Sequence, residues 1–448
     1  MSSDQEEVLA ALHELGAWGA GLRWENVPSR VQERLRLVLL DSLAVTIAGG
    51  RLPERKPLVT AWDPGPGVCP VLGAGVLTGP DTAAWLNATA MVSLELDEGN
   101  KHAAGHPAAH GFPAVLALAA HLASDGPTTA AALLVAYEVA SRFGRGSRLR
   151  PGMHPHGNWG MAGGAAGCAR LFGLDAAGTA AAMDTASGMP VAGHFAAALD
   201  GNPVRHEWMG ATAAAALAAA RLARAGAAHA TGIAARSLGE LLGEFDPAEL
   251  RAQLGTRWDI ELGYFKRHAS CAFTHPAADA ALQLRRSLVL DEVKEVVVEV
   301  SSMAAGLDRT RADTRLGAMF SIPFVTATAL VHGVVEPASY TEERLHDVRL
   351  AALARRVRVV AAPDLDQRLP AERAVRMVVR SLDSTEARCS LPNPVGDADY
   401  QPYDETGLTD LLGELLGPGD ALDRAQTCAR ELPGASSVRP LLAALATP

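Results

Sequence analysis

The sequence has few cysteines, and no two of them are closely spaced. Five cysteines are dispersed among 448 residues, and no CxxC pattern occurs. Disulfide frameworks and cysteine-rich zinc or iron-sulfur sites need paired or clustered cysteines, so this sequence argues against both. The five are Cys69, Cys168, Cys271, Cys389 and Cys428.

Long uncharged apolar runs and basic stripes are also absent. No segment reaches the roughly 18 to 20 apolar residues that span a bilayer. The formal net charge is -10 and the arginines are scattered, so we expect neither a membrane span nor a nucleic-acid partner. The acidic start, Met-Ser-Ser-Asp-Gln-Glu-Glu, lacks the basic and apolar regions of a signal peptide, which predicts a cytoplasmic protein.

The composition that is present predicts a globular protein with an ample core. Apolar residues make up 48% of the chain and charged residues 20%. The length exceeds one ordinary core, so we expect two domains. The fold class predicted is mainly α, with a large all-helical domain and a smaller inserted α+β domain. We expect a helical part over residues 1–265, the α+β domain over 266–393, and a helical tail over 394–448 that rejoins the first part.

The spacing of apolar residues predicts the individual elements, with periods near 3.6 for helices and 2 for strands. Residues 50–80, rich in Gly and Pro, predict a loop, and residues 142–150 predict a polar break. Alternation predicts strands over residues 292–301, 357–361, 374–380 and 386–391, the last two paired. Helices are predicted over residues 6–23, 28–49, 81–94, 114–124, 127–143, 177–188, 211–225, 276–287, 318–332 and 342–355.

The densest polar chemistry lies in residues 95–113, Glu-Leu-Asp-Glu-Gly-Asn-Lys-His-Ala-Ala-Gly-His-Pro-Ala-Ala-His-Gly-Phe-Pro. An Ala/Leu-rich helix is predicted directly behind it, after Pro113. Free backbone N–H groups and the helix dipole favour anionic ligands at such a helix start. We therefore expect a functional site here.

The three histidines of this stretch leave three interpretations open. His102, His106 and His110 have the i, i+4, i+8 spacing of metal ligands on one helix face. Gly105 and Pro107 interrupt any such helix, which favours a loop with His106 as an acid/base group whose protonation Asp97 or Glu95 sets. A histidine that only satisfies backbone groups is the third interpretation.

Further polar loops precede other helices. Residues 153–156, Met-His-Pro-His, and the Arg205-His206-Glu207 run are two of them. Residues 266–276 form another, at the predicted domain junction, where ligand sites are common. Within it Lys266 suits an anion clamp or a proton donor, and Cys271 is either a nucleophile or, more commonly for its type, a small buried side chain.

Glycines at residues 160–167 do not form a nucleotide site. The strand that should precede them and the acidic residue that should follow are both missing. The sequence therefore does not indicate a nucleotide cofactor.

Five ordered motifs together resemble the MmgE/PrpD family over nearly the whole chain. They are the acidic cluster with His-Pro in residues 95–114, Gly-Met-His-Pro-His-Gly-Asn-Trp-Gly at 152–160 ahead of a helix ending in Phe-Gly-Leu-Asp, and Lys-Arg-His-Ala-Ser-Cys with a later His-Pro from residue 266. Met-Phe-Ser-Ile-Pro-Phe at 319–324 and Pro-Val-Gly-Asp-Ala-Asp at 394–399 complete the set.

The resemblance implies a large helical domain built from both chain ends, a smaller α+β lid, a homodimer, and catalysis without a metal or an organic cofactor. The family chemistry it implies moves a proton next to a carboxylate, with loss of water or carbon dioxide or with return of the proton. The active-site positions it implies are His106, His154, Lys266 and Asp97.

Several positions depart from the family pattern. Arg205 stands where many members have Lys, His156 replaces a Thr, Gly99 and Asn100 replace a Thr, and Phe324 occupies a position that is often Tyr. Arg does not readily donate a proton, so we expect an anion clamp there without a proton donor. The residues expected to contact the substrate are Arg205, Asn100, His102, His156, Cys271 and Phe324.

The leading hypothesis from the sequence is a cofactor-independent lyase acting on a small polycarboxylate, with dehydration placed ahead of decarboxylation. In it Arg205 and Lys266 hold carboxylates, and His106 or His154 takes the proton. Two alternatives stand beside it: an epimerase or isomerase on the same scaffold, and a polycarboxylate-binding protein without catalysis.

Overall fold

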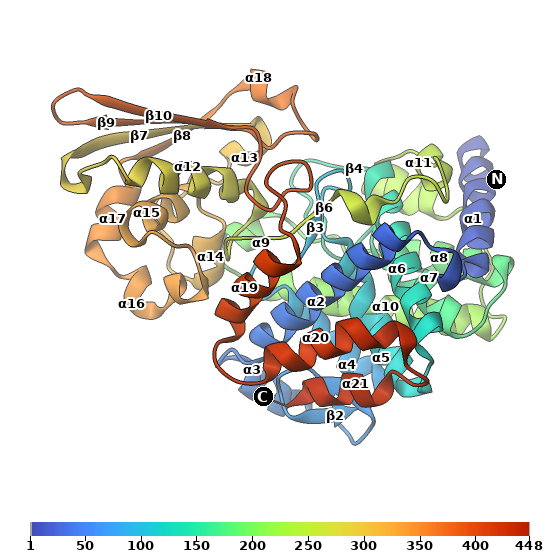
Figure 1. The fold of residues 1–448 in the computed structure, drawn as a ribbon. Coiled ribbons are helices and arrows are strands. Elements are labelled where there is room, and N and C mark those ends of the chain that lie inside the picture. The colour runs from blue at the N-terminus through green and yellow to red at the C-terminus, as the bar shows by residue number, and fades with distance from the viewer. Residues whose placement is uncertain (1, 448) are drawn as a thin grey trace.

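The structure is a computed structural model that describes residues 2–447. It is mainly helical, with a large helical part and a smaller α+β part joined side by side (Figure 1). The helices that precede the α+β part are α1 (Ser3–Gly21), α2 (Ser29–Gly50), α3 (Arg55–Trp62), α4 (Pro80–Met91), α5 (Pro107–Leu122), α6 (Gly126–Gly146), α7 (Met161–Leu171), α8 (Ala176–Ser187), α9 (Ala196–Leu199), α10 (Val204–Arg224) and α11 (Ala248–Arg251).

Capping residues start several of these helices as the sequence chemistry requires. Ser2 and Gln5 form a capping box at the start of α1. Asp125 caps α6 and Asp175 caps α8, each accepting a backbone N–H with its side chain. Pro107 occupies the first turn of α5, where a missing N–H costs nothing.

Small residues let the central helices approach closely. A Cβ atom on Gly163 of α7 would lie 2.3 Å from the Ala136 carbonyl oxygen of α6. One on Gly167 would lie 2.8 Å from the Ala132 oxygen. The buried alanines of α5, α6, α7 and α10 therefore form one tightly packed core, and the polar loops stand at the ends of its helices.

The α+β part is built on a four-stranded sheet in the order β10-β9-β7-β8. β7 pairs parallel with β8 and antiparallel with β9, while β9 and β10 form a hairpin. Helices α12 and α15 lie along one side of the sheet (Figure 1). Its strands are β7 (Val293–Val300), β8 (Val357–Ala361), β9 (Val375–Ser381) and β10 (Glu386–Leu391). Its helices are α12 (His275–Arg285), α13 (Ser302–Ala305), α14 (Arg315–Met319), α15 (Ile322–His332), α16 (Glu342–Leu345), α17 (Val348–Ala354) and α18 (Pro363–Asp366).

The C-terminal helices return to the large helical part. α19 (Glu405–Leu416) and α20 (Ala421–Glu431) pack against α2, and α21 (Arg439–Ala443) packs against α5. Helix α2, near the start of the chain, and the last helices thus share one core. Two-stranded pairings add β1 (Cys69–Val71) with β2 (Val76–Thr78), β3 (Gly99–Asn100) with β6 (Gly263–Tyr264), and β4 (Ser147–Leu149) with β5 (Gly243–Phe245).

The four predicted strands are confirmed, including the pairing of the last two. The pattern predicts them because a sheet with one covered face alternates buried and exposed residues along its strands. Three helix predictions are wrong in extent. α5 begins at Pro107 and not after Pro113, since proline is tolerated in a first helical turn. α6 runs on to Gly146 through the predicted break, and α10 begins at Val204 and not at residue 211.

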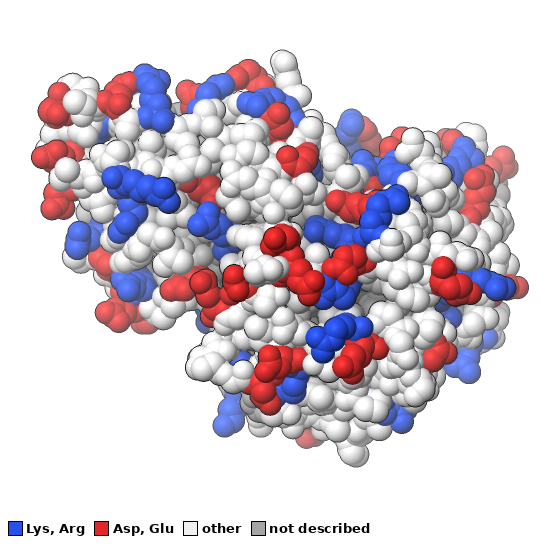
Figure 2. Space-filling view, viewed as in Figure 1, with Lys and Arg blue, Asp and Glu red and all other residues white. Residues whose placement is uncertain are grey.

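The predicted loop over residues 50–80 contains helix α3 and the β1–β2 pair. The predicted helices over 318–332 and 342–355 are each two helices. Ser321 separates α14 from α15 because its side chain caps the second helix. Among residues 2–447, no helix is both long and apolar enough to cross a bilayer. On the face shown in Figure 2, basic and acidic side chains are interspersed and no stripe of one sign crosses the surface.

Candidate active site

A short strand pairing brings two halves of the candidate site together. β3 lies in the histidine-rich stretch, and β6 ends just ahead of Lys266. They pair antiparallel with Gly99 opposite Tyr264. A Cβ atom on Gly99 would lie 2.4 Å from the Tyr264 hydroxyl, so glycine suits this close approach. The chain that follows β6 therefore runs beside the acidic residues.

Four buried charged side chains lie at the centre of this junction. Glu95, Asp97, Arg205 and Lys266 are each no more than 1% exposed. The Lys266 Nζ atom lies 3.5 Å from Glu95 Oε2 and 3.4 Å from Asp97 Oδ1. Arg205 Nη1 forms an ion pair with Glu95 Oε1. Two cations face two carboxylates, so the four charges cancel when all are ionised.

The surroundings shift the pKa values of these groups in different directions. Burial raises the pKa of the Glu95 carboxyl and outweighs the opposing effect of Arg205 and Lys266. For Asp97, burial is outweighed by His106, Lys266 and Arg205 together, and its pKa lies below the usual value. Burial also opposes the charge on Lys266, but Asp97 and Glu95 hold its pKa above normal.

His106 lies at the N-cap of α5, between the acidic residues and the helix core. Its Nδ1 donates to the Glu98 carbonyl oxygen over 2.8 Å. The same atom lies 3.0 Å from Asp97 Oδ2. The contact does not meet hydrogen-bond geometry, but the carboxylate is near enough to interact electrostatically with the ring. Because Nδ1 faces acceptors it carries the hydrogen, and Nε2 keeps a lone pair. Burial lowers the pKa of His106 to about 4, against the opposing effect of Asp97.

His154 has the opposite tautomer. Its Nδ1 accepts a hydrogen bond of 3.1 Å from the backbone N–H of His156, so the ring hydrogen lies on Nε2. The ring stacks on Phe195 with centroids 5.2 Å apart and lies 5.3 Å from Trp208. Burial, followed by the nearby Arg205, lowers the pKa of His154 well below its usual value. The site therefore contains one imidazole that offers a lone pair and one that offers a hydrogen.

His156 lies between these two rings. Its centroid is 4.5 Å from His154 and 5.4 Å from His106. Its Nε2 lies 3.5 Å from Arg205 Nη2, and its buried Nδ1 has no hydrogen-bond partner. His110 supports the group from α5, where its Nδ1 donates to the His106 carbonyl and its ring packs 4.6 Å from Trp159.

Arg205, on α10, is held by the protein itself. Besides the ion pair with Glu95, it donates to the Val92 carbonyl over 3.0 Å. Its guanidinium also lies 5.5 Å above the Phe320 ring. Only Nε remains buried without a hydrogen-bond partner. A substrate carboxylate would therefore have to share this cation with Glu95.

Lys101 fastens the histidine-rich stretch to the α+β part. Its Nζ lies 2.9 Å from Asp397 Oδ1 and 2.8 Å from Asp399 Oδ1, and it donates to the Ala371 carbonyl over 2.6 Å. Arg373 adds a 2.9 Å ion pair with Asp397. This cluster, buried except for Asp399, positions the loop that carries His106 relative to the residues after β6.

Asn100 and His102 lie in the same stretch but face away from the charged centre. Asn100 donates to the Asp259 carbonyl over 2.8 Å, and its side-chain oxygen accepts from the backbone of His102 and Ala103. These contacts occupy its amide group and brace the loop. Burial, with nearby Arg145, lowers the pKa of the half-buried His102. The structure thus places both predicted contact residues in supporting positions.

Cys271 and Phe324 are both buried. Burial raises the pKa of the Cys271 thiol to about 11, and the adjacent Glu95 contributes in the same direction. A thiol in that state is a poor nucleophile. Phe324, in the first turn of α15, stacks on Tyr340 with centroids 5.9 Å apart.

Two contributors were missed by reasoning from the sequence. Glu98 accepts a 2.5 Å hydrogen bond from the Tyr137 hydroxyl, and burial raises its pKa to about 8. Its place beside Asp97 in the acidic cluster was a usable signal. Tyr340 gave no signal, because no motif surrounds it and only folding brings it near Glu95.

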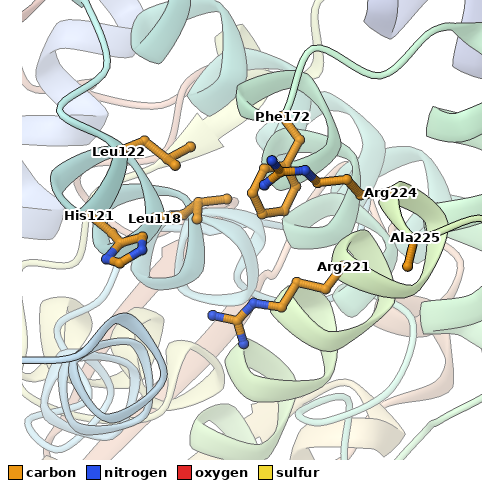
Figure 3. A pocket seen from close by; sticks show the side chains of 7 residues that line it. All are labelled: Leu118, His121, Leu122, Phe172, Arg221, Arg224 and Ala225. Carbon is orange, nitrogen blue, oxygen red and sulfur yellow. The ribbon is translucent and has the colours of Figure 1, made fainter.

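A surface pocket of about 400 Å³ lies away from this centre, between α5, α7 and α10 (Figure 3). It includes Leu118 and Leu122, at the opposite end of α5 from His106. Arg221 there is held by Asp81 on both guanidinium nitrogens, and Arg224 stacks over Phe172 at 4.6 Å. Its lining residues include one histidine and no carboxylate. Among residues 2–447, no three His, Cys, Asp or Glu side chains are arranged as ligands of one metal ion.

Comparison with known families covers both parts of the chain. The MmgE/PrpD N-terminal domain matches residues 13–247, and the MmgE/PrpD C-terminal domain matches residues 268–408. The chain belongs to the MmgE/PrpD family. Lys266 falls between the two matched regions, at the junction that β3 and β6 create.

Two curated relatives are named after a reaction. A cis-aconitate decarboxylase of Aspergillus terreus is 26% identical over 438 residues, covering 90% of this chain and 88% of that protein. The cis-aconitate decarboxylase-like protein oryM of Aspergillus oryzae is 27% identical over 359 residues, covering 72% and 73%. Membership of the MmgE/PrpD family together with these relatives supports a lyase-type function.

Proposed function

We propose that this protein is a cofactor-independent lyase that acts on a small polycarboxylate. The observation that carries the proposal is the state of His106. It is a buried imidazole whose Nδ1 is engaged by a backbone carbonyl and whose low pKa leaves Nε2 with a free lone pair. An imidazole in this state serves as a general base that removes a proton from the substrate.

Buried cations beside this base support a carboxylate substrate. Removing a proton from a carbon next to a carboxylate places negative charge on the carboxylate oxygens. Lys266 and Arg205 are fixed, desolvated cations, which stabilise such charge far better than water does. A substrate carboxylate would compete with Glu95 and Asp97 for these cations. We therefore expect a substrate that binds through more than one of its own carboxylates.

The relatives favour loss of carbon dioxide as the outcome. One is named a cis-aconitate decarboxylase and the other a decarboxylase-like protein. Loss of carbon dioxide leaves its bonding electrons on the substrate carbon, which then takes up a proton from a donor such as His154 Nε2–H. Loss of water is the other elimination, and it follows removal of a substrate proton by the neutral His106. We propose decarboxylation as the leading reaction and dehydration as its alternative.

A second candidate is an epimerase or isomerase of a small dicarboxylate. The opposite tautomers of His106 and His154 favour it, because one ring can take a proton while the other offers one. Such a reaction moves the proton without breaking a further bond. The product would then have the same composition as the substrate.

Incubation with di- and tricarboxylates in deuterated buffer, followed by NMR, separates these outcomes. Decarboxylation gives a product one carbon shorter, dehydration gives a new alkene, and epimerisation gives solvent deuterium in an otherwise intact acid. We expect deuterium at the carbon next to a carboxylate together with elimination. Binding of the acids without any change in them would contradict the lyase and leave a polycarboxylate-binding protein.

A further inference from the structure

Tyr340 ends the short 3₁₀ turn Pro337–Tyr340 in the α+β part. Its side chain is buried, and the residue is 3% exposed. The hydroxyl is also buried and has no hydrogen-bond partner. Buried polar groups are nearly always partnered, so an unpartnered phenol requires an explanation.

Two contacts fix Tyr340 beside the chain that carries Lys266. The backbone N–H of Ala269 donates to the Val335 carbonyl, which ties the segment before the turn to the segment after β6. A capping box between Glu336 and Ser339 shapes the turn itself. The Tyr340 ring therefore has a defined position, and its stacking on Phe324, with planes 23° apart, restricts it further.

The ring faces the charged centre and not the outer surface. Phe324, on one side of it, lines an outer pocket of about 470 Å³ with residues such as Arg311 and Leu345. On the other side Glu95 is close enough to raise the pKa of Tyr340, and the Ser270 hydroxyl is close enough to lower it, although that hydroxyl does not meet hydrogen-bond geometry with Tyr340. Burial, with the nearby Glu95 carboxylate, holds the pKa of Tyr340 well above its usual range. The hydroxyl therefore remains protonated and can donate a hydrogen bond.

Other unpartnered buried atoms belong to the same centre. They include Glu95 Oε1, which contacts Arg205 only as an ion pair, Arg205 Nε and His156 Nδ1. Buried helical hydroxyls such as that of Thr326 are also unpartnered, but a helical Thr can turn toward a carbonyl of the preceding turn. A rigid phenol cannot reach its own backbone in this way. Tyr340 and these atoms are thus buried polar groups without a hydrogen-bond partner in the protein.

We propose that Tyr340 donates its hydroxyl hydrogen to an oxygen of the bound polycarboxylate. The inference rests on the proposed function, since it names a group that recognises the same substrate. The substrate oxygen would give the phenol the partner it lacks in the free protein. Tyr340 would then be a specificity-determining contact supplied by the α+β part, opposite the histidines supplied by the helical part.

Tyr340→Phe tests the proposal, because it removes the hydroxyl and keeps the ring stacked on Phe324. The measurements are the Kd for citrate, used as a tricarboxylate probe, by calorimetry, and kcat and KM for any acid converted in the deuterium experiment. Loss of one hydrogen bond to a charged oxygen should weaken citrate binding and raise KM by roughly tenfold. The thermal midpoint should not fall, since the free protein leaves this hydroxyl unpartnered.

Ser270→Ala is the matched control. Ser270 carries a hydroxyl that influences the pKa of Tyr340, and it already accepts a 2.7 Å hydrogen bond from Thr274. If Tyr340 served only to contact Ser270, both variants would change stability alike and leave Kd and KM unaltered, which would overturn the proposal. Unchanged citrate binding in Tyr340→Phe would overturn it as well.

The two proposals fail in different ways. Conversion by the wild type that Tyr340→Phe leaves unchanged would overturn the role of Tyr340 alone. Citrate binding without conversion of any acid would overturn the lyase, while a weaker Kd in Tyr340→Phe would still support the contact. A wild type that neither binds nor converts polycarboxylates would overturn both.

Discussion

Within residues 2–447, two buried histidine–carboxylate pairs differ in what surrounds them. His106 Nδ1 lies 3.0 Å from Asp97, and His268 Nε2 lies 3.1 Å from Asp279. All four side chains are buried. Residue type, distance and burial therefore do not distinguish the pairs, and both histidines fall within motifs that the sequence singles out.

The carboxylate partners reveal the difference. Both oxygens of Asp279 are occupied, since Oδ1 accepts from His268 and Arg267 and Oδ2 accepts from the Val395 N–H over 2.9 Å. Asp97 Oδ2 has no hydrogen-bond partner and lies among other unpartnered atoms. A saturated pair stabilises the fold where the α+β part begins. An unsaturated pair can exchange a proton with a ligand.

The largest effect should come from removing the base. His106→Gln keeps a donor for the Glu98 carbonyl but loses the basic Nε2. We expect a loss of a hundredfold or more in kcat, or in deuterium exchange, with the fold retained. His268→Gln is the matched control and should change the rate per folded molecule by less than about threefold. Similar losses in both variants would show that the two pairs are not functionally distinct.

A smaller effect, on stability and not on rate, should come from the saturated pair. Asp279→Asn removes a buried charge that holds His268, Arg267 and the Val395 amide. We expect a loss of about 1–3 kcal/mol in the free energy of unfolding, measured by urea denaturation, with kcat nearly unchanged. Asp97→Asn should instead lower kcat and leave the free energy of unfolding nearly unchanged. Equal stability losses in both variants would contradict the comparison.

The smallest effect should be the pH dependence of the rate between pH 8 and pH 5. The His106 pKa of about 4 lies below the ordinary value of 6.5, so the neutral base persists throughout this range. We expect kcat to change by less than about twofold and to fall only as the pH approaches 4. A histidine with an ordinary pKa would instead lose about thirtyfold over this range.

Stability should nevertheless fall over part of that range. In the unfolded chain this histidine takes up a proton near pH 6.5, whereas in the folded protein it does so near pH 4. The unfolded state then binds more protons, so stability declines as the pH falls from 6.5 to 4. Rates therefore need short assays with folded protein confirmed by circular dichroism. A kcat that drops about threefold between pH 7 and pH 6 in folded protein, as an ordinary histidine predicts, would be incompatible with a buried neutral His106.

Much of the architecture was predictable from local pattern. The alternation in Val293–Val300 predicted a central strand, and the Ala-rich runs predicted buried helices. Helix starts were less predictable, because Pro107 and Val204 extend their helices into segments that read as loops. A proline in a first turn is compatible with a helix, so packing decided where α5 begins.

The sequence by itself determined the family, the helical and strand segments, and the loops in which His106, His154 and Lys266 would be found. Only the tertiary structure decided which ring nitrogen carries the hydrogen and which carboxylate is saturated. Those outcomes depend on contacts between residues far apart in the chain, such as Lys266 with Glu95 across 171 positions. Local spacing carries no information about such contacts, because they form only when separate helices and strands pack together.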